Sequence, residues 1–550
     1  MNQFVNIAHG LKRSAEKFPY KRAVVYPAGR DAGGRVTYSQ ITFKQLDKGS
    51  DEIAFGLEKT GITRGTRTIL MVTPSLDFFL IIFAMCKVGA VPVVVDPGMG
   101  LKRMLSCLEQ SKPKAFIGIE KAHVLRKFAP AFFRSIKIWI TVGKRWFWGG
   151  YKLDNIRKTG KEKYQCAGTT RDETAAIVFT TGSTGPAKGV VYTHGNFAAQ
   201  IEQIRKHFKI EDDEVDLPTF PLFALFDPAL SMTAVIPDMD PTRPARANPE
   251  KLIEAIENNG VTNMFASPAL LHRLGRYGKE NNIKLPSLRR VVSAGAPVSP
   301  GNIEQFSTML RDSARIHTPY GATEAVPIIS IDSNEILQET RKLSEKGYGM
   351  CVGRPILNTD IRIIKITDDP ISQLRESHFL GKNDVGEIIV KADLVTKQYF
   401  NNRKADLFAK IPDSSGGIWH RMGDVAWMDK DGRFWFCGRK NHRVETVCGT
   451  MFSIPCEAVF NNHEKVYRSA LVGVGKKGDQ TPVLFVEPFD TIGDKTGFKD
   501  ELIELAASFS HTKNIEHFFI EKSFPVDIRH NSKIFREKLA VKAERLIKNR

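Results

Sequence analysis

The sequence predicts an α/β protein with at least two domains, and three observations support this prediction. At 550 residues the chain is too long for one ordinary compact domain. Helical and strand periodicities alternate through its first half, as they do in proteins built on an α/β sheet. From about residue 355, short apolar runs between Gly and Asp turns replace that alternation and indicate a β-rich subdomain over about 355–438.

The alternation of helix and strand is clearest between residues 76 and 96. Apolar residues at helical spacing over 76–83 predict a helix that ends near Gly89. The apolar run over 91–96 follows directly and predicts a buried strand. The ranges 261–266 and 290–293 repeat the strand pattern, so we expect further strands of the same kind there.

The second half of the chain has shorter elements. The ranges 360–366, 386–390 and 433–436 predict strands, and 411–417 predicts an exposed loop because it is rich in Gly and Ser. After Arg439 come roughly a hundred residues of mixed strand and helix pattern, which is enough for a small separate domain.

Composition excludes several classes of protein. Hydrophobic residues make up 42% and charged residues 26% of the chain, which is typical of a globular protein rather than a disordered one. The seven cysteines form no CxxC pair, so we expect neither a disulfide framework nor a zinc site, and a reducing cytoplasm fits. The first twenty residues lack the apolar core of a signal peptide, and no apolar run reaches eighteen residues.

The chain is basic, with 80 Lys and Arg against 61 Asp and Glu and a formal net charge of +19. Such a balance is compatible with nucleic acid, an anionic membrane or an anionic substrate. We find no helix-turn-helix, RRM or zinc-finger pattern, so we predict no nucleic-acid partner. The last eighteen residues hold seven Lys or Arg against two Glu, which indicates either peripheral membrane contact or the solvated face of a terminal helix.

The strongest local signal is the stretch 177–189, where an apolar strand runs into a loop. The loop holds three glycines, four hydroxyl residues and Lys188. Glycines let the backbone approach a polyphosphate, amides and hydroxyls donate to its oxygens, and the lysine supplies the opposite charge. A Walker A loop is excluded, because it needs Gly before and Ser or Thr after the lysine, and Ala187 and Gly189 stand there.

This loop resembles the phosphate-binding signature of the adenylate-forming superfamily, which contains acyl-CoA synthetases, luciferases and peptide-synthetase adenylation domains. Five further stretches resemble the other motifs of the superfamily in the same order: 293–298, 318–324, Gly423-Asp424, Gly438-Arg439 and 531–539. Six motifs in order are too many for coincidence, and the chain is identified as a member of this superfamily.

The resemblance implies a large N-terminal domain of stacked α/β subdomains plus the β-rich subdomain, followed by a small mobile α+β domain. The implied limits are 1–438 for the AMP-binding domain, 439–442 for the hinge and 443–550 for a lid that carries the catalytic lysine.

The resemblance also implies ATP and Mg²⁺ as cofactors. Tyr320 would stack on adenine, Thr323 would contact the α-phosphate, and Asp424 would accept from the ribose hydroxyls. Carboxylate attack on the α-phosphorus creates a highly anionic transition state that Mg²⁺ and lysines neutralise. The implied catalytic residues are Lys533, Thr184 and Glu324, with Glu324 also holding the metal. The implied nucleotide-binding residues are Thr180, Thr181, Gly182, Ser183, Gly185, Lys188, Gly295, Ala296, Pro297, Tyr320, Gly321, Thr323, Asp424 and Arg439.

Departures from the superfamily pattern put the CoA half-reaction in doubt. Asn441 stands where acyl-CoA synthetases usually carry Asp or Lys, and the loop over 444–449 reaches its glycine one residue late. Ser532 replaces a glycine, and Ala224 stands where a histidine often follows the Pro-Leu-Phe segment. A long-chain fatty acyl-CoA or acyl-AMP ligase remains the alternative function.

Longer strings resemble the β-lactone synthetases of the bacterial long-chain olefin pathway, and the similarity covers essentially the whole chain. These strings are 216–230, 235–244, 419–425, 437–446 and 524–531. The implied substrate is a long-chain 2-alkyl-3-hydroxy acid, which is adenylated and then closed to a β-lactone by its own hydroxyl. The implied partners are a thiolase-like condensing enzyme, a ketoreductase and a decarboxylase-like enzyme. We expect a cytoplasmic protein, with membrane association open.

The pocket for the alkyl chains is predicted from one aromatic string. The candidate pocket residues are Phe220, Phe223 and Phe226, with Leu225 and Asp227 beside them and His194 after the phosphate loop. Core packing is an equally good interpretation of each aromatic residue. Asp227 either lines the pocket or neutralises Arg243. His194 and His420 are candidates for the base of ring closure by residue type, a structural role is the other interpretation, and the adenylate phosphate is a third.

Overall fold

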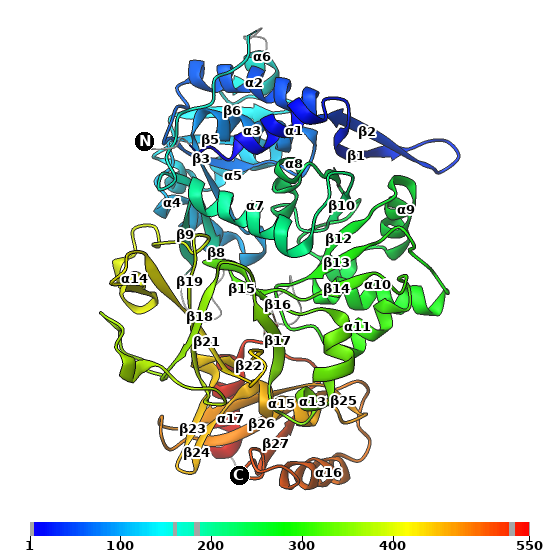
Figure 1. Cartoon of the computed structure of the whole chain (residues 1–550), viewed down its shortest axis with the longest axis vertical. Coiled ribbons are helices and arrows are strands. Elements are labelled where there is room, and N and C mark those ends of the chain that lie inside the picture. Colours follow the sequence, from blue (N-terminus) through cyan, green and yellow to red (C-terminus); the bar gives the residue numbers. More distant parts are fainter. Residues whose placement is uncertain (1–4, 158–161, 181–186, 527–533, 549–550) are drawn as a thin grey trace.

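The computed structural model describes residues 5–157, 162–180, 187–526 and 534–548. Figure 1 shows the N-terminal half at the top, the β-rich part in the middle and the C-terminal domain at the bottom. Two seven-stranded sheets, one eight-stranded sheet and two small C-terminal sheets make up the described part. The predicted α/β architecture is therefore confirmed.

The first seven-stranded sheet has the order β7-β6-β5-β3-β4-β8-β9 and is parallel except for β9. Helix 76–88 and strand 91–95 confirm the first helix–strand pair, and Gly89 ends the helix at a φ of 75°. The strands are β3 (Arg67–Met71), β4 (Val91–Val95), β5 (Ala115–Ile119), β6 (Ile138–Val142), β7 (Tyr151–Lys152), β8 (Thr174–Thr180) and β9 (Lys188–Thr193). The helices are α2 (Phe43–Thr60), α3 (Leu76–Val88), α4 (Leu101–Gln110), α5 (Glu120–Phe128) and α6 (Leu153–Ile156).

The second seven-stranded sheet has the order β14-β13-β12-β10-β11-β1-β2 and is parallel except for β2. Helices α10 and α11 begin with a proline after a serine cap, so the chain turns sharply at the carboxyl edge of the sheet. The strands are β1 (Arg22–Arg30), β2 (Val36–Thr42), β10 (Val215–Pro218), β11 (Thr233–Val235), β12 (Asn263–Ala266), β13 (Arg290–Ser293) and β14 (Arg315–His317). The helices are α1 (Ala8–Lys17), α7 (His194–Phe208), α8 (Asp227–Leu230), α9 (Pro249–Asn259), α10 (Pro268–Glu280) and α11 (Pro300–Ser307).

The eight-stranded sheet forms the β-rich part, and it begins earlier than the predicted residue 355. Strands β15, β16 and β17 join it from residue 320 onward. They were missed because β15 is three residues long and β16 contains a proline, which is unusual inside a strand. The strands are β15 (Tyr320–Ala322), β16 (Ala325–Ser330), β17 (Met350–Pro355), β18 (Asp360–Ile364), β19 (Gly386–Lys391), β20 (Lys410–Pro412), β21 (Ile418–Met428) and β22 (Phe434–Arg439). Its helices are α12 (Ser333–Glu335), α13 (Arg341–Glu345) and α14 (Arg403–Ala409).

The C-terminal domain follows a 3₁₀ turn over Lys440–His442. Its contact with the β-rich part includes Asp368, which accepts from Arg443 at 2.8 Å and from Lys477 at 2.9 Å. The strands are β23 (Val444–Thr446), β24 (Gly449–Met451), β25 (Val466–Val474), β26 (Thr481–Pro488) and β27 (His517–Ile520), and the helices are α15 (Ser453–Asn461), α16 (Lys495–Ala507) and α17 (Arg536–Lys548). None of the described helices has the length and hydropathy needed to cross a membrane.

A substitution at Gly353 tests how closely β17 packs against β16. Its φ is 94°, and a Cβ there would lie 2.1 Å from the carbonyl oxygen of Ser330. We expect Gly353→Ala to lower the free energy of unfolding by about 3 kcal/mol, measured by denaturant unfolding. Gly432→Ala is the matched control, because its φ of 76° is similar and its Cβ would meet nothing within 4 Å. Equal losses in both variants would show that the contact with β16 is not tight.

Candidate active site

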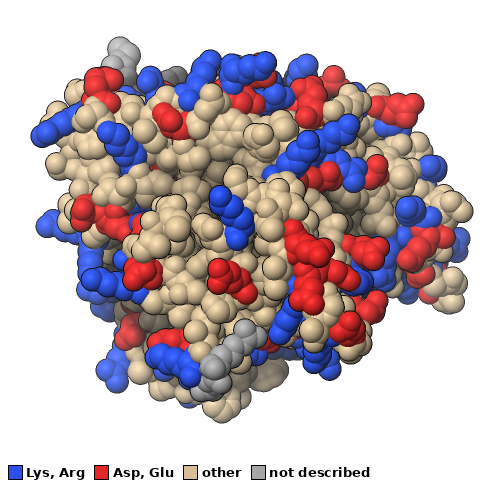
Figure 2. Space-filling view, turned by 90° about the horizontal axis from the view of Figure 1, so that it is seen from below, with Lys and Arg blue, Asp and Glu red and all other residues tan. Residues whose placement is uncertain are grey.

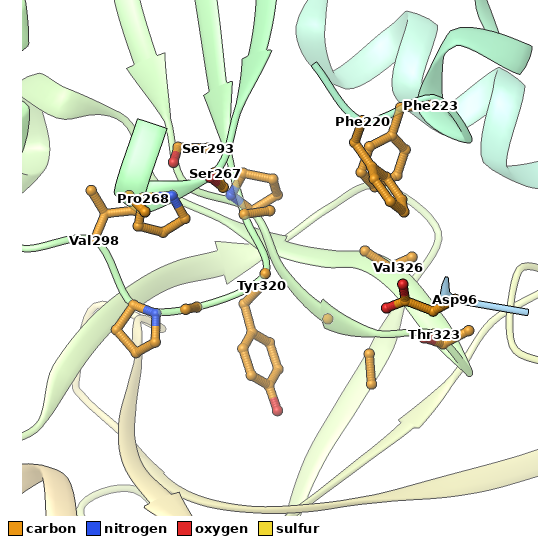
Figure 3. Close-up of a pocket in the computed structure, with 18 of the residues that line it drawn as sticks. Asp96, Phe220, Phe223, Ser267, Pro268, Ser293, Val298, Tyr320, Thr323 and Val326 are labelled. Carbon is orange, nitrogen blue, oxygen red and sulfur yellow. The ribbon is translucent and has the colours of Figure 1, made fainter. Parts of the chain in front are cut away.

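A cavity of about 2350 Å³ opens where the two seven-stranded sheets meet the β-rich sheet and the C-terminal domain. Pockets for drug-sized ligands measure about 300–1,000 Å³, so this cavity has room for a nucleotide and a second large molecule. Figure 3 shows Phe220 and Phe223 on one side, Ser293 and Val298 on another, and Tyr320 between them. The cavity follows the carboxyl ends of parallel strands, where α/β proteins usually bind ligands.

Asp424 is the charged centre of one end of the cavity. Its Oδ2 accepts a hydrogen bond from the Tyr320 hydroxyl at 2.6 Å, and its Oδ1 lies 3.1 Å from Nε of Arg439. Burial raises the pKa of Asp424, and the neighbouring guanidinium opposes that shift. Because Asp424 comes from β21, Tyr320 from β15 and Arg439 from the end of β22, this carboxyl group joins three segments.

A loop after β13 forms the wall near Tyr320. Gly295, Ala296 and Pro297 line the cavity there. The Ser293 hydroxyl just before them is buried and has no hydrogen-bond partner among the described residues. Such a group can bond to a bound molecule, so this wall offers it a polar contact.

Glu324 marks the second polar region. Its Oε1 accepts from the Tyr399 hydroxyl at 2.6 Å, and its backbone carbonyl accepts from the amide of Thr396 at 2.9 Å. The ammonium group of Lys188 lies 4.9 Å from the centroid of the Tyr399 ring. Tyr399 therefore fixes the carboxylate and stands beside the cation. The neighbouring Thr323 is held by its carbonyl, which accepts from the Tyr192 hydroxyl.

A second lysine, which the sequence did not indicate, lies behind this region. Lys410 is buried, its ammonium group donates to the carbonyl of Thr396, and it lies 5.6 Å from the Tyr399 ring. Burial lowers the pKa of Lys410 to about 8. The adjacent His420 lines the cavity, its Nδ1 lies 3.1 Å from the carbonyl of Ala409, and burial holds its pKa well below the usual value.

The residues present fit Mg²⁺ bound together with phosphates. The described residues contain no cluster of three or more His, Cys, Asp or Glu suited to a metal ion. Mg²⁺ usually takes one or two carboxylates and completes its octahedron with phosphate oxygens and water. Glu324, oriented by Tyr399 on the cavity wall, is a carboxylate of that kind.

The predicted aromatic residues lie on the cavity wall, whereas two of the predicted polar residues do not. Phe220, Phe223 and Phe226 line the cavity, and the ring of Phe265 joins them at 4.4 Å from that of Phe223. His194 is not on the cavity wall. It is buried, its Nδ1 accepts from the amide of Ile7, and burial lowers its pKa to about 4.

Asp227 is also absent from the cavity wall. It is buried at the start of α8 and hydrogen-bonds to the buried carboxyl group of Asp216 on β10. Burial and the neighbouring carboxyl group raise the pKa of Asp227 well above its usual value, and burial raises that of Asp216 to about 7. The sequence left Asp227 open between a pocket residue and a partner of Arg243, and the structure places it in a buried carboxyl pair instead.

Several predicted residues lie outside the described part of the chain. These are Thr181, Gly182, Ser183, Thr184, Gly185 and Lys533, and Thr180 is described only as the last residue of β8. Lys188 on β9 lines the cavity, and so do Ile534 and Arg536, which follow Lys533. Gly321, Thr323 and Glu324 lie on the same wall.

The AMP-binding enzyme family model matches residues 11–400, and the chain belongs to that family. It is 45% identical over 560 residues to the olefin beta-lactone synthetase of Stenotrophomonas maltophilia, with all of both chains covered. It is 45% identical over 549 residues to that of Xanthomonas campestris, with 98% of both covered.

Solved structures with similar folds cover nearly the whole chain. The anthranilate CoA ligase AuaEII with anthranoyl-AMP has a TM-score of 0.80 at 16% identity, covering 100% of this chain and 99% of that one. O-succinylbenzoate CoA synthetase from Bacillus subtilis with ATP and magnesium has a TM-score of 0.75 at 19% identity, covering 96% and 98%. These likenesses establish the fold.

The carboxyl pair makes stability depend on pH. In the unfolded chain Asp227 and Asp216 ionise near pH 4, whereas their pKa values are raised in the folded protein. The folded protein therefore loses stability as pH rises from about 4 to about 7. We expect Asp227→Asn to raise Tm by about 2 °C or more at pH 8 and much less at pH 5, measured by differential scanning calorimetry.

Asp240→Asn is the control of opposite sign. Hydrogen bonds from Thr242 lower the pKa of Asp240, so its charged form stabilises the fold above pH 4. This variant is expected to lose a little stability at pH 8. A gain for Asp227→Asn that is the same at pH 5 and pH 8 would contradict the shared burial of the two carboxyl groups.

Proposed function

We propose that this protein is an ATP-dependent β-lactone synthetase of long-chain olefin biosynthesis. Its substrate is a long-chain 2-alkyl-3-hydroxy fatty acid, and its products are the β-lactone, AMP and pyrophosphate. The observation that carries the proposal is the 45% identity over the full chain to two olefin beta-lactone synthetases. The arrangement of polar and apolar walls in one cavity supports it.

The polar end of the cavity suits the nucleotide in the first half-reaction. Asp424 would accept from the ribose hydroxyls and Tyr320 would pack against adenine. Lys188 and the buried Lys410 place positive charge near Glu324, where the phosphate chain would lie. Bound Mg²⁺, held by Glu324, would neutralise charge on the phosphate oxygens. The predicted roles of the phosphate loop, with Thr184, and of Lys533 complete this proposal.

The apolar end suits the two alkyl chains. Aromatic residues Phe220, Phe223 and Phe265 form one wall, and α3 contributes Phe78 and Ile82 to another. Each buried methylene group adds about 0.8 kcal/mol to binding, so long chains supply the energy that holds the carboxylate in place.

The second half-reaction needs no further substrate. The β-hydroxyl oxygen attacks the activated acyl carbon, and the new carbon–oxygen bond closes the four-membered ring. The bond from the acyl carbon to the adenylate oxygen breaks, AMP leaves, and its phosphate takes up the hydroxyl proton. An intramolecular nucleophile gains effective molarity when the cavity holds the two groups in contact. This agrees with the altered residues Asn441 and 444–449 in the region that serves CoA in related ligases.

Other enzymes of the proposed pathway would supply the substrate and consume the product. A thiolase-like condensing enzyme and a ketoreductase would supply the β-hydroxy acid, and a decarboxylase-like enzyme would consume the lactone. The proposed location is the cytoplasm.

Product analysis with and without CoA tests the proposed function. With ATP, Mg²⁺ and a synthetic 2-alkyl-3-hydroxy acid, we expect a product lighter than the acid by one water, formed with AMP and independent of CoA. Mass spectrometry and AMP quantification measure both. A thioester that forms only when CoA is present would make the protein an acyl-CoA ligase instead.

Tyr399→Phe tests the orientation of Glu324. Loss of the hydroxyl removes the 2.6 Å hydrogen bond to the carboxylate. We expect about a tenfold or greater fall in ATP–pyrophosphate exchange and a higher Mg²⁺ concentration at half-maximal rate. Tyr192→Phe is the matched control, since its hydroxyl donates to the backbone carbonyl of Thr323 and not to the carboxylate. An unchanged Mg²⁺ dependence in Tyr399→Phe would remove Tyr399 from this role.

A further inference from the structure

One surface of the protein combines cationic and exposed aromatic side chains. We call it the α5–β7 surface and define it as residues 120–157, from α5 through β6 and β7 to the end of α6. This stretch contains nine Lys or Arg and two acidic residues, Glu120 and Asp154. Its charge is therefore much more one-sided than that of the whole chain, which has 80 basic and 61 acidic residues.

Large aromatic side chains on this surface are exposed to solvent. The exposed fractions are 83% for Phe128, 76% for Phe147, 55% for Trp146 and 47% for Tyr151. Four exposed large aromatics within 24 positions are unusual for a surface without a partner, because exposed apolar patches commonly mark interaction sites.

The aromatic loop between β6 and β7 is anchored. Trp148 is buried, its ring stacks on that of His123 at 5.3 Å, and its Nε1 donates to the Thr141 hydroxyl at 3.0 Å. With Trp148 fixed inward, its neighbours Trp146 and Phe147 are left on the outside. The exposure of Trp146 and Phe147 therefore results from the anchoring of Trp148.

Cations and aromatic rings lie together on this surface. The ammonium group of Lys127 is 5.6 Å from the ring centroid of Phe147, and the guanidinium of Arg126 is 4.3 Å from that of Trp139. Aromatic side chains favour the headgroup region of a bilayer, and Lys and Arg attract anionic lipids. The pairing matches both components of such an interface.

Helix α5 also connects this surface to the cavity. Lys121 and Leu125, one turn apart, line the cavity, while Lys127 and Phe128 at the end of the helix are exposed. Helix α5 therefore reaches from the cavity wall to this surface. A substrate with long alkyl chains could pass from a bilayer to the cavity along this helix.

We propose that the α5–β7 surface docks onto bilayers that contain anionic lipid. This goes beyond the proposed reaction, and lipid binding itself does not depend on that function. The C-terminal end of the molecule is a weaker candidate, because Figure 2 shows Lys and Arg interspersed with Asp and Glu on that face. Figure 1 places α5 and β6 in the upper part, away from the C-terminal domain.

Vesicle co-sedimentation of the full chain tests this proposal. The probes are phosphatidylcholine vesicles with and without 30% phosphatidylglycerol. We expect binding to the anionic vesicles and little binding to the neutral ones. Lys127→Glu with Phe147→Ala should weaken anionic-vesicle binding at least about fivefold, which corresponds to the loss of one Lys near an anionic surface. Trp146→Ala with Phe147→Ala should weaken it while leaving its salt dependence unchanged.

Tyr20→Ala with Lys44→Glu is the matched control. Tyr20 is 80% exposed and Lys44 lies 5.7 Å from its ring, so this pair has the same chemistry elsewhere on the surface. The proposal is overturned if the control loses as much binding as the Lys127/Phe147 variant, or if neither loses any. Wild-type binding to neutral vesicles but not to anionic ones would also overturn the proposal. So would an α5–β7 surface that binds an acidic protein but neither kind of vesicle.

A second measurement separates docking from catalysis. Turnover of a short-chain soluble 2-alkyl-3-hydroxy acid should be unchanged in the Lys127/Phe147 variant, whereas turnover of a long-chain acid delivered in anionic vesicles should fall. This comparison rests on the proposed function, and the co-sedimentation does not. If neither acid is turned over by the wild type, the proposed function fails while the docking result stands on its own.

Discussion

The arrangement of the site depends on one buried carboxylate, that of Asp424. Among the described residues, the guanidinium of Arg439 and the phenol hydroxyl of Tyr320 compensate the cost of burying it. Because Arg439 is the last residue of β22 and the 3₁₀ turn follows at once, this carboxylate also fixes where the chain leaves the large domain. This end of the cavity and the connection to the C-terminal domain therefore share one electrostatic constraint.

A second buried ion pair lies at the connection between the β-rich part and the C-terminal domain. Glu387 and Arg421 are almost fully buried and lie 2.6 Å apart, and Lys440 reaches Glu387 at 3.2 Å. Buried ion pairs add little net stability, but removing one partner leaves a charge that the interior cannot solvate. These ion pairs thus fix the position of Lys440, although they add little to the free energy of unfolding. The mobility predicted for the C-terminal domain would require Lys440 to leave this site or to act as its pivot.

The candidate site residues that lie in recognisable motifs could be predicted from the sequence. The residues that contact and orient them could not. Lys188, Glu324 and Asp424 come from separate motifs, and the fold brings all three to one cavity. Tyr399 lies 75 residues from the carboxylate it orients, and nothing in its neighbourhood distinguishes it from a core tyrosine. Lys410 gave no signal either, because a lone lysine usually indicates solvent exposure and only packing reveals its burial. His194 and Asp227 are buried and do not line the cavity, because residue type alone does not separate a pocket residue from a buried structural one.

The two half-reactions of the proposed reaction make different demands on the cavity. Adenylation needs charges held at fixed positions, and in the proposed reaction buried groups such as Asp424 and Lys410 would supply them. Ring closure needs two groups of one substrate held in contact, which depends on the shape of the apolar wall and not on a second cofactor tunnel. On this proposal, ring closure makes no use of Asn441 or of 444–449 and depends on the packing of Phe223 against Phe265, whose rings lie 4.4 Å apart. Selectivity for chain length and branching should therefore depend on these aromatic residues.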